Sequence, residues 1–149
     1  MHSHILDPRE CASVVVSFRD PGGHLVINGK RVLRVIAESH REAVETFLQT
    51  PLSAALIGDQ ILISTKPVRD SEVGAFVGDI SSLESVAPLV VEHRYIEFPS
   101  YPYEWPPDML RAAGELTLDL MERLLAEGYG LKDASPYNIL FRGAQPIFV

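Results

Sequence analysis

An acid and an amide lie five residues apart in the stretch from Gly128 to Leu140. Asp133 offers a carboxylate and Asn138 an amide oxygen, in the pattern Asp-x-x-x-x-Asn followed by Ile-Leu. In phosphoryl transfer, a carboxylate orients the attacking hydroxyl and an amide oxygen helps to hold Mg²⁺. The pattern therefore makes Asp133 and Asn138 candidate catalytic residues, with Asn138 also a candidate metal ligand.

The same stretch has a second interpretation that involves no catalysis. Residues 133–136 have the composition of an Asx turn, and Asn138 can simply brace the backbone of its own loop. The histidine that commonly stands two residues before such an aspartate is replaced by Leu131. The residues alone leave both a catalytic and a structural role open.

Other parts of a phosphotransferase site are poorly represented. No Gly-x-Gly-x-x-Gly occurs. A lysine is expected on the third strand, but Arg34 stands there, where it could pair with Glu42 or Glu45 of the next helix. Arg34 and Glu45 are therefore candidate cofactor-binding residues, and the alternative for Arg34 is an ordinary strand residue with an exposed head. The second metal-binding carboxylate of such a site would fall beyond Val149.

The first half of the sequence predicts an antiparallel meander followed by helices. Asn28-Gly29 is a strong hairpin signal, and Asp20 to Gly23 has the composition of a turn. Ser39 and Glu42 form a capping box that predicts the start of a helix. Pro51 ends this helix, and residues 52–57 predict a second one closed by Gly58. The expected strands are residues 11–18, 24–27, 30–36 and 60–65. Residues 66–88 are expected to form a loop or a weak strand.

The second half predicts a strand, a crossing segment, a long helix and a hairpin. Residues 89–98 begin apolar and then alternate, as a strand entering a core does. Asp108 is the expected N-cap of a helix over 109–127, and Gly128 the expected left-handed residue after it. The expected elements beyond the loop are a strand at 139–142, a turn at 143–144 and an apolar stretch at 146–149.

The segment 99–107 contains four prolines and three aromatic residues and predicts an extended, polyproline-like crossing. Tyr101, Tyr103 and Trp105 line a binding groove in one interpretation, and Lys132 and Tyr137 of the later loop are its further candidates. In the other interpretation the aromatic rings anchor the segment to the surface that it crosses, and the sequence favours this anchoring role.

These elements together predict an α+β fold. We expect a β-rich part with one main helix over residues 1–98, the crossing over 99–107, and a helix-loop-hairpin part over 108–149. A meander plus helix joined to a long helix and a catalytic-loop-like hairpin would correspond to a truncated kinase-like fold. Because Ile147-Phe148-Val149 reads as an apolar strand, we expect the sequence to be a piece of a longer chain.

Composition excludes several classes of partner and site. The net charge of -7 argues against general binding to nucleic acid or to an anionic membrane. No apolar run is long enough to span a bilayer, and the N-terminus is not a signal peptide. Cys11 is the single cysteine, which excludes an internal disulfide and fits a reducing compartment. The expectation is a soluble cytoplasmic domain, whose oligomeric state the sequence does not indicate.

Two blocks of sequence resemble a known family. Tyr-Pro-Tyr-Glu-Trp at 101–105 and Leu-Lys-Asp-Ala-Ser-Pro-Tyr-Asn at 131–138 look like the N-terminal region of class I SAM-dependent methyltransferases of the nodulation type. Weaker likeness extends over most of the chain, at residues 20–23, 34, 62–63, 109–110 and 116–120. The helix end and strand around 131–138 also resemble the catalytic loop of protein kinases and aminoglycoside-type phosphotransferases.

The resemblance implies an N-terminal accessory domain that binds a substrate or a partner and lies in cis to a C-terminal methyltransferase domain. S-adenosylmethionine is then implied for the parent protein and no cofactor for this chain, which has no glycine-rich strand-turn-helix. The alternatives are a kinase-like phosphotransferase fragment that uses a Mg-nucleotide with Asp133 and Asn138, and a purely structural docking domain.

Overall fold

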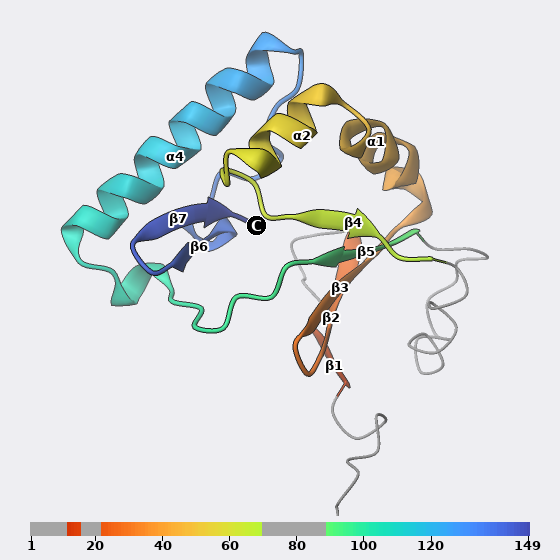
Figure 1. Cartoon of the computed structure of the whole chain (residues 1–149), viewed down its shortest axis with the longest axis horizontal. Helices are drawn as coiled ribbons and strands as arrows, with labels where there is room; N and C mark the ends of the chain where they lie inside the picture. The colour runs from red at the N-terminus through yellow and green to blue at the C-terminus, as the bar shows by residue number, and fades with distance from the viewer. Residues whose placement is uncertain (1–11, 16–21, 70–88) are drawn as a thin grey trace, which may run out of the picture. The chain divides into compact units, whose positions relative to one another are not determined.

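The computed structural model describes residues 12–15, 22–69 and 89–149 (Figure 1). The chain divides into two compact units, which are described separately below. Unit 1 comprises residues 1–45 and 66–95, and unit 2 comprises residues 46–65 and 96–149. Helices and an antiparallel sheet occur together, so the fold class is α+β, as the sequence predicts. Residues 46–65 join the unit of the C-terminal helix, whereas the sequence pattern groups them with the N-terminal strands.

Unit 1 is built on a five-stranded sheet in the order β1-β2-β3-β5-β4 (Figure 1). Each of the pairs β1–β2, β2–β3 and β3–β5 is antiparallel. The strands are β1 (Ala12–Val15), β2 (Gly23–Asn28), β3 (Arg31–Ile36), β4 (Thr65–Pro67) and β5 (Leu89–His93). The predicted meander is therefore confirmed. The expected turn at Asp20 and Pro21 and most of residues 66–88 lie outside the described residues.

The β2–β3 hairpin turns one residue later than Asn28-Gly29. Asn28 pairs with Arg31, which leaves Gly29 and Lys30 as the two loop residues. Gly29 has φ +57°, a left-handed conformation that glycine adopts without a Cβ clash. The pattern thus located the hairpin correctly, and the requirement for positive φ placed glycine at its first loop position.

One face of this sheet forms the core of unit 1. Val26, Leu33, Val35 and Val90 are buried together, and Val68 packs against them. Val26 lies opposite Leu33, and Val35 lies opposite Val90, so the cluster consists of directly facing pairs on three neighbouring strands. The alternation of β3 therefore fixes its register, because a slip by one residue would expose Leu33 and Val35.

The two predicted helices of the first half are present, with different starts. Helix α1 spans Glu38–Leu48, so Ser39 lies inside it and does not serve as its N-cap, contrary to the capping-box prediction. Helix α2 spans Pro51–Gly58. Thr50 is its N-cap, and the Thr50 hydroxyl accepts a hydrogen bond from the Ser53 amide at 3.0 Å. Pro at the first helical position explains why α1 stops and α2 begins here.

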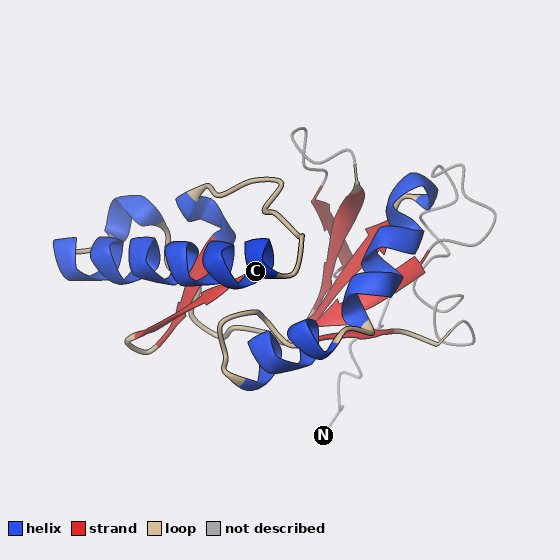
Figure 2. Cartoon of the chain, turned by 90° about the horizontal axis from the view of Figure 1, so that it is seen from above, coloured by secondary structure: helices blue, strands red, loops and turns tan. Residues whose placement is uncertain are grey.

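Unit 2 packs a long helix against a hairpin. Helix α4 spans Pro107–Ala126, and the hairpin consists of β6 (Ile139–Arg142) and β7 (Gln145–Phe148). Figures 1 and 2 both show the hairpin lying against α4, and α4 contacts β7. The buried core residues are Leu56, Ile61, Trp105, Ala113, Leu120, Leu124, Ile139, Phe141 and Phe148. Ala113, Leu120 and Leu124 are seven and four residues apart, so they lie on one face of the helix.

The expected strand at 60–65 is divided between the two sheets. Its first part pairs with β7: the Phe148 amide donates to the Ile61 carbonyl at 2.9 Å, and the Ile63 amide donates to the Phe148 carbonyl at 2.8 Å. Its last residue, Thr65, begins β4 of the other sheet. A continuous apolar run cannot by itself indicate which of two sheets a strand joins, and this is why the prediction gave one strand.

Three predictions for the second half need correction. Strand β5 ends at His93 and does not reach Phe98. Pro106, and not Asp108, is the N-cap of α4, because Pro107 takes the first helical position that prolines favour. Residues 102–104 form a short 3₁₀ turn, so the crossing segment is not extended throughout. Gly128, with φ +79°, is the left-handed residue after α4, as predicted.

Replacement of Gly23 with alanine is expected to destabilise unit 1. A Cβ at this position would lie 2.3 Å from the Val35 carbonyl oxygen of the neighbouring strand, so backbone would have to move. We expect Gly23→Ala to lower the free energy of unfolding by about 2 kcal/mol in a urea titration.

Gly114 of α4 provides the matched control for this variant. A Cβ at Gly114 meets no atom within 4 Å, so Gly114→Ala should stabilise the helix by about 0.5–1 kcal/mol. Equal effects of the two replacements on unfolding would contradict the close approach of β3 to Gly23.

Candidate functional site

The loop that carries Asp133 and Asn138 is anchored where it leaves α4. The Tyr129 amide donates to the Leu124 carbonyl at 2.8 Å and closes the helix. The Tyr129 ring meets Phe47 edge-on, with ring centroids 5.3 Å apart, and Leu131 packs against the core of unit 2. The first residues of the loop are thus fixed by burial before the polar residues begin.

Asp133 forms an Asx turn with its own loop. Its Oδ1 accepts a hydrogen bond from the Ser135 amide at 2.8 Å. The Ser135 hydroxyl in turn accepts from the Tyr137 amide at 3.3 Å, and a 3₁₀ turn, η2, follows over Pro136–Asn138. These contacts are the ones expected for an aspartate followed by Ser-Pro. One carboxylate oxygen therefore serves the local backbone.

Asn138 closes the same loop from its other end. Its side-chain amide nitrogen Nδ2 donates to the Asp133 backbone carbonyl at 3.0 Å, and the Asn138 backbone carbonyl accepts from the Val149 amide at 2.8 Å. The next residue, Ile139, is buried and begins β6. The structure thus brings the two predicted residues together through the backbone of Asp133, in a loop that β6 and β7 hold in place.

The remaining side-chain oxygens of this pair are Asp133 Oδ2 and Asn138 Oδ1. Neither accepts a hydrogen bond from any residue that the structure describes. With its NH₂ donating inward, Asn138 presents a carbonyl oxygen, which is a hard ligand of the kind that Mg²⁺ binds. The loop therefore has a structural role in its own turn and two oxygens left for a ligand.

Trp105 anchors the aromatic segment to the core. Its side chain is 6% exposed, and its ring meets Phe141 of β6 edge-on, with centroids 4.9 Å apart. The indole Nε1 donates to the Ser100 hydroxyl at 3.0 Å, which satisfies the polar end of the ring. Trp105 therefore occupies the anchoring position that the sequence favours for the rings of this segment.

Tyr101 and Tyr103 project from the turn that Trp105 anchors. They are 41% and 76% exposed, and their rings stack with centroids 5.9 Å apart and planes inclined by 15°. The Tyr101 amide donates to Glu104 Oε2 at 2.7 Å, and the Glu104 amide donates to the Tyr101 carbonyl at 2.8 Å. Residues 100–105, which we call the aromatic turn, thus present a fixed pair of rings to solvent.

The remaining predicted site residues lie in other elements. Lys132 and Tyr137 are exposed in the loop after α4, Tyr137 by 62%. Arg34 lies in β3 opposite Val91. The Glu45 carboxylate receives a hydrogen bond from Arg41 Nε of its own helix at 3.1 Å, and the possible pairing of Arg34 with Glu42 or Glu45 is not among the contacts of the described residues.

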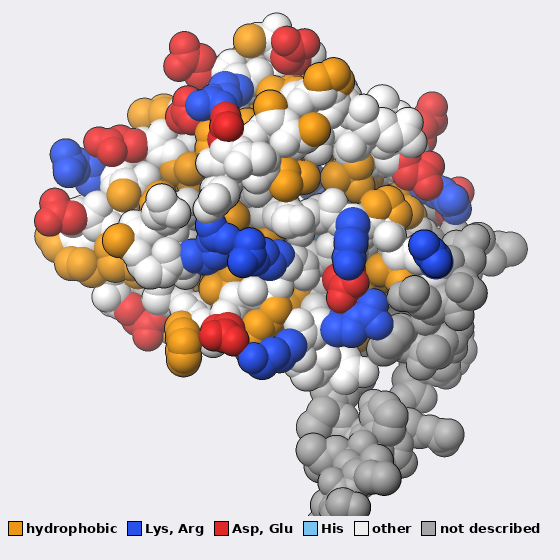
Figure 3. Space-filling view, viewed as in Figure 1, with side chains coloured by type: hydrophobic (Ala, Val, Ile, Leu, Met, Phe, Trp, Pro, Cys, Tyr) orange, Lys and Arg blue, Asp and Glu red, His pale blue; other side chains and the backbone are white. Residues whose placement is uncertain are grey.

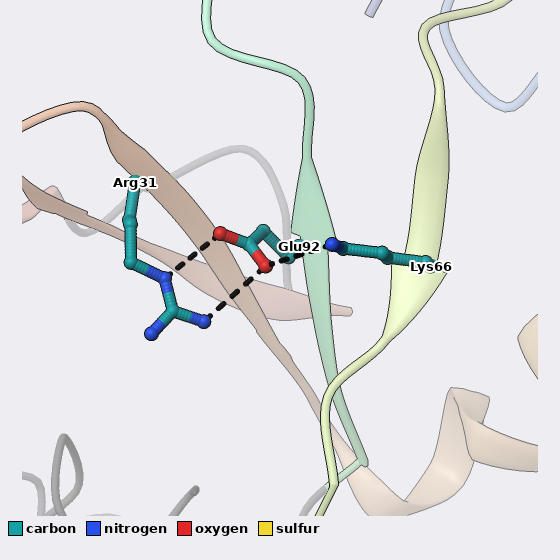
Figure 4. A network of polar contacts seen from close by, with 3 residues as sticks. All are labelled: Arg31, Lys66 and Glu92. Atoms are coloured by element: carbon teal, nitrogen blue, oxygen red, sulfur yellow. Dashed lines mark hydrogen bonds and ion pairs between the residues drawn. The ribbon is translucent and has the colours of Figure 1, made fainter.

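A charge cluster in unit 1 is absent from the sequence predictions. Arg31 Nε donates to Glu92 Oε1 at 2.8 Å, Arg31 Nη2 donates to Oε2 at 3.2 Å, and Lys66 Nζ lies 3.6 Å from Oε2 (Figure 4). The hydrogen bond from Arg31 lowers the pKa of Glu92 despite partial burial. A carboxylate within an apolar strand sequence, such as Glu92, indicates that an ion pair is needed. Its partners Arg31 and Lys66 can be identified only from the pairing of the strands.

His93 at the end of β5 has a strongly altered acidity. Burial lowers the pKa of His93 to about 4, and the positive charge of Arg34 adds to the effect. Because His93 lies opposite Val32, it is diagonal to Arg34 on the same face of the sheet. His93 is therefore neutral near pH 7, and in the folded chain it gains a proton only when the pH falls to about 4.

Exchange of Asn138 for aspartate is expected to open the loop. The new side chain would place a carboxylate against the Asp133 carbonyl, which has no proton to give, so the closing hydrogen bond would be lost. We expect Asn138→Asp to lower the stability of unit 2 by about 1–2 kcal/mol and to speed hydrogen exchange at the Ser135 amide.

Asp133→Asn is the matched control, because the asparagine oxygen still accepts from the Ser135 amide and preserves the Asx turn. Unchanged exchange in Asn138→Asp, or equal effects of both variants, would contradict closure by Asn138.

Stability of unit 1 is expected to fall as the pH drops from about 6.5 to about 4. Over this range the unfolded chain binds a proton at His93 and the native state does not, so the free energy of unfolding rises with pH. The full effect is at most about 3 kcal/mol.

His93→Gln should flatten this part of a pH series of urea titrations. Loss of stability from Glu92 is confined to more acid pH, because its lowered pKa holds it ionised until the pH passes below its ordinary value. An unchanged slope between pH 6.5 and 4.5 in His93→Gln would contradict this assignment.

Comparison with known proteins gives one informative relative. The chain is 32% identical over 136 residues to Nodulation protein NoeA of Rhizobium meliloti strain 1021. The match covers 91% of this chain but only 27% of NoeA. No known family profile matches the chain, and no solved structure matches it. Within the described residues, no helix has the length and apolar character needed to cross a membrane. The chain is thus similar to a part of NoeA, and the greater part of NoeA lies outside the match.

Proposed function

We propose that this chain is an accessory, substrate- or partner-binding region of a longer, NoeA-like protein with SAM-dependent methyltransferase activity. The similarity to 27% of NoeA supports a region of a larger protein. The resemblance of the blocks at 101–105 and 131–138 to nodulation-type methyltransferases supports the activity of the parent. In this proposal S-adenosylmethionine binds in a further domain in cis and not in this chain.

The arrangement of the described strands supports a cofactor site outside this chain. Cofactor sites of doubly wound folds lie at the carboxyl ends of parallel strands, beside a glycine-rich turn. The strand pairs β1–β2, β2–β3 and β3–β5 are antiparallel, and the sequence lacks that turn. The candidate binding residues of this chain lie on turns and loops and not at the ends of parallel strands.

The aromatic turn is the observation that carries the binding role. The backbone of the turn is held by the Glu104 hydrogen bonds, and its base is held by buried Trp105, while the two tyrosine rings are exposed. Because the turn is already ordered, a ligand that binds it does not have to fix a flexible segment, and this favours affinity. Exposed Lys132 and Tyr137 on the loop after α4 are further candidate contacts.

A specific observation also favours the phosphotransfer alternative. The Asn138 amide nitrogen donates to the Asp133 carbonyl, and neither Asn138 Oδ1 nor Asp133 Oδ2 accepts a hydrogen bond from the described residues. Asn138 would hold Mg²⁺ of a bound nucleotide, and Asp133 would orient a hydroxyl. Arg34 and Glu45 are the candidate cofactor-binding residues under this alternative only.

The docking alternative is supported by α4. Hydrophobic, acidic and basic side chains are mixed over the region of this helix (Figure 3). Leu110, Leu118 and Leu125 are exposed at helical spacing. A second domain packed there would bury them. A purely structural role would then need neither the aromatic turn nor the loop.

Thermal unfolding with added ligands separates these functions. We expect the unfolding temperature of this chain to stay unchanged with S-adenosylmethionine and with ATP, in the presence or absence of Mg²⁺. A rise with ATP that requires Mg²⁺ and disappears in Asn138→Ala would establish the phosphotransfer alternative instead.

In a longer protein that carries this region, Tyr103→Ala should raise KM for the methyl acceptor about fivefold or more and leave the Kd for S-adenosylmethionine unchanged. Tyr103→Phe is the matched control, because it keeps the ring. The absence of methyl transfer by the longer protein would contradict the proposed methyltransferase activity of the parent.

A further inference from the structure

The aromatic turn combines an open ring face with a carboxylate on the next residue. One face of the Tyr103 ring meets Tyr101, and the side chain is still 76% exposed, so its opposite side is open to solvent. Glu104 follows directly and is exposed, and its Oε2 is fixed by the Tyr101 amide. Glu104 Oε1 accepts no hydrogen bond from the described residues.

This pair of groups fits a planar cation. The negative face of an aromatic ring attracts a cation that lies over it, and a guanidinium can stack flat on the ring. The same guanidinium has several N–H donors at fixed angles, so it can also donate to a carboxylate beside the ring. An ammonium makes neither the stack nor a forked hydrogen bond. Arginine therefore fits the turn better than lysine.

Charge disfavours nucleotides as ligands of this turn. Nucleotides also stack on tyrosine, but their phosphates would meet the Glu104 carboxylate on a chain of net charge -7. A basic ligand is instead drawn toward the chain by the same charge. Phe98, 85% exposed in the segment before the turn, offers further apolar surface for the residues that flank an arginine.

We propose that the aromatic turn binds an arginine side chain from a basic segment of a partner protein, stacked on Tyr103 and hydrogen-bonded to Glu104. This inference rests on the proposed binding function and specifies its partner: a protein segment that carries exposed arginine. The hydrogen bonds between Tyr101 and Glu104 order the turn before the partner arrives, which lowers the entropic cost of binding.

A peptide titration followed by NMR tests the proposal on the chain itself. Acetyl-tetraarginine amide should bind with shifts centred on the amides of residues 101–104, at least about fivefold more tightly than acetyl-tetralysine amide of equal charge. Tyr103→Ala should weaken binding of tetraarginine about fivefold or more, whereas Tyr103→Phe, which keeps the ring, should bind like the original chain.

The carboxylate is tested without loss of the turn. In Glu104→Gln the amide oxygen still accepts from the Tyr101 amide, so the turn is kept while the charge is removed. We expect this variant to weaken tetraarginine binding severalfold. Glu115→Gln removes the same charge from exposed α4 and should have little effect.

Three results would overturn the proposal. Equal binding of tetraarginine and tetralysine, or no loss in Tyr103→Ala, would leave only general electrostatic attraction to an acidic chain. Shifts at 101–104 with the neutral disaccharide cellobiose but not with tetraarginine would assign the rings to a sugar. Failure of the parent methyltransferase assay alone would leave the arginine site standing, because the peptide titration does not involve methyl transfer.

Discussion

The burial of Trp105 is the interaction on which the second unit of this chain depends most visibly. Its ring fills the space beside Phe141 of β6, and its indole nitrogen holds Ser100. One side chain therefore joins the segment before α4 to the hairpin after it. The exposed tyrosines and the closed loop at 133–138 lie on opposite sides of α4 in sequence, and both are attached to the hairpin core that this ring helps to fill. Removing the ring would leave a large cavity and release the turn that presents Tyr101 and Tyr103.

Local signals in the sequence located most of the elements. Prolines and glycines with definite backbone requirements did this best: Pro51 separates α1 from α2, and Gly128 ends α4. The loop contacts of Asp133 and Asn138 follow from the same local chemistry, since both donors and acceptors lie within five residues. Such features depend only on residues that are close in sequence, and they can therefore be predicted from the sequence alone.

Features set by distant parts of the chain could not be predicted. The run at 60–65 reads as one strand, but its two ends pair with different sheets because Phe148 takes the first part. Arg31 and Glu92 are 61 residues apart, and only the β3–β5 register makes them neighbours. Ser39 and Glu42 match a capping box, but the turn after β3 already starts the helix at Glu38. In each case contacts between distant parts of the chain determined a feature that local propensity does not predict.

The pairing of β7 with residues 61–63 has a consequence for the order of folding. Gln60 and Arg142, which flank this pairing, form a hydrogen bond across 82 residues of sequence. The core around Leu56 and Ile61 therefore cannot be completed until the hairpin has been synthesised. Loops of this length close slowly compared with a helix or a two-residue turn. During synthesis, α2 and residues 61–63 would therefore expose apolar side chains for longer than a segment that pairs with its neighbours in sequence.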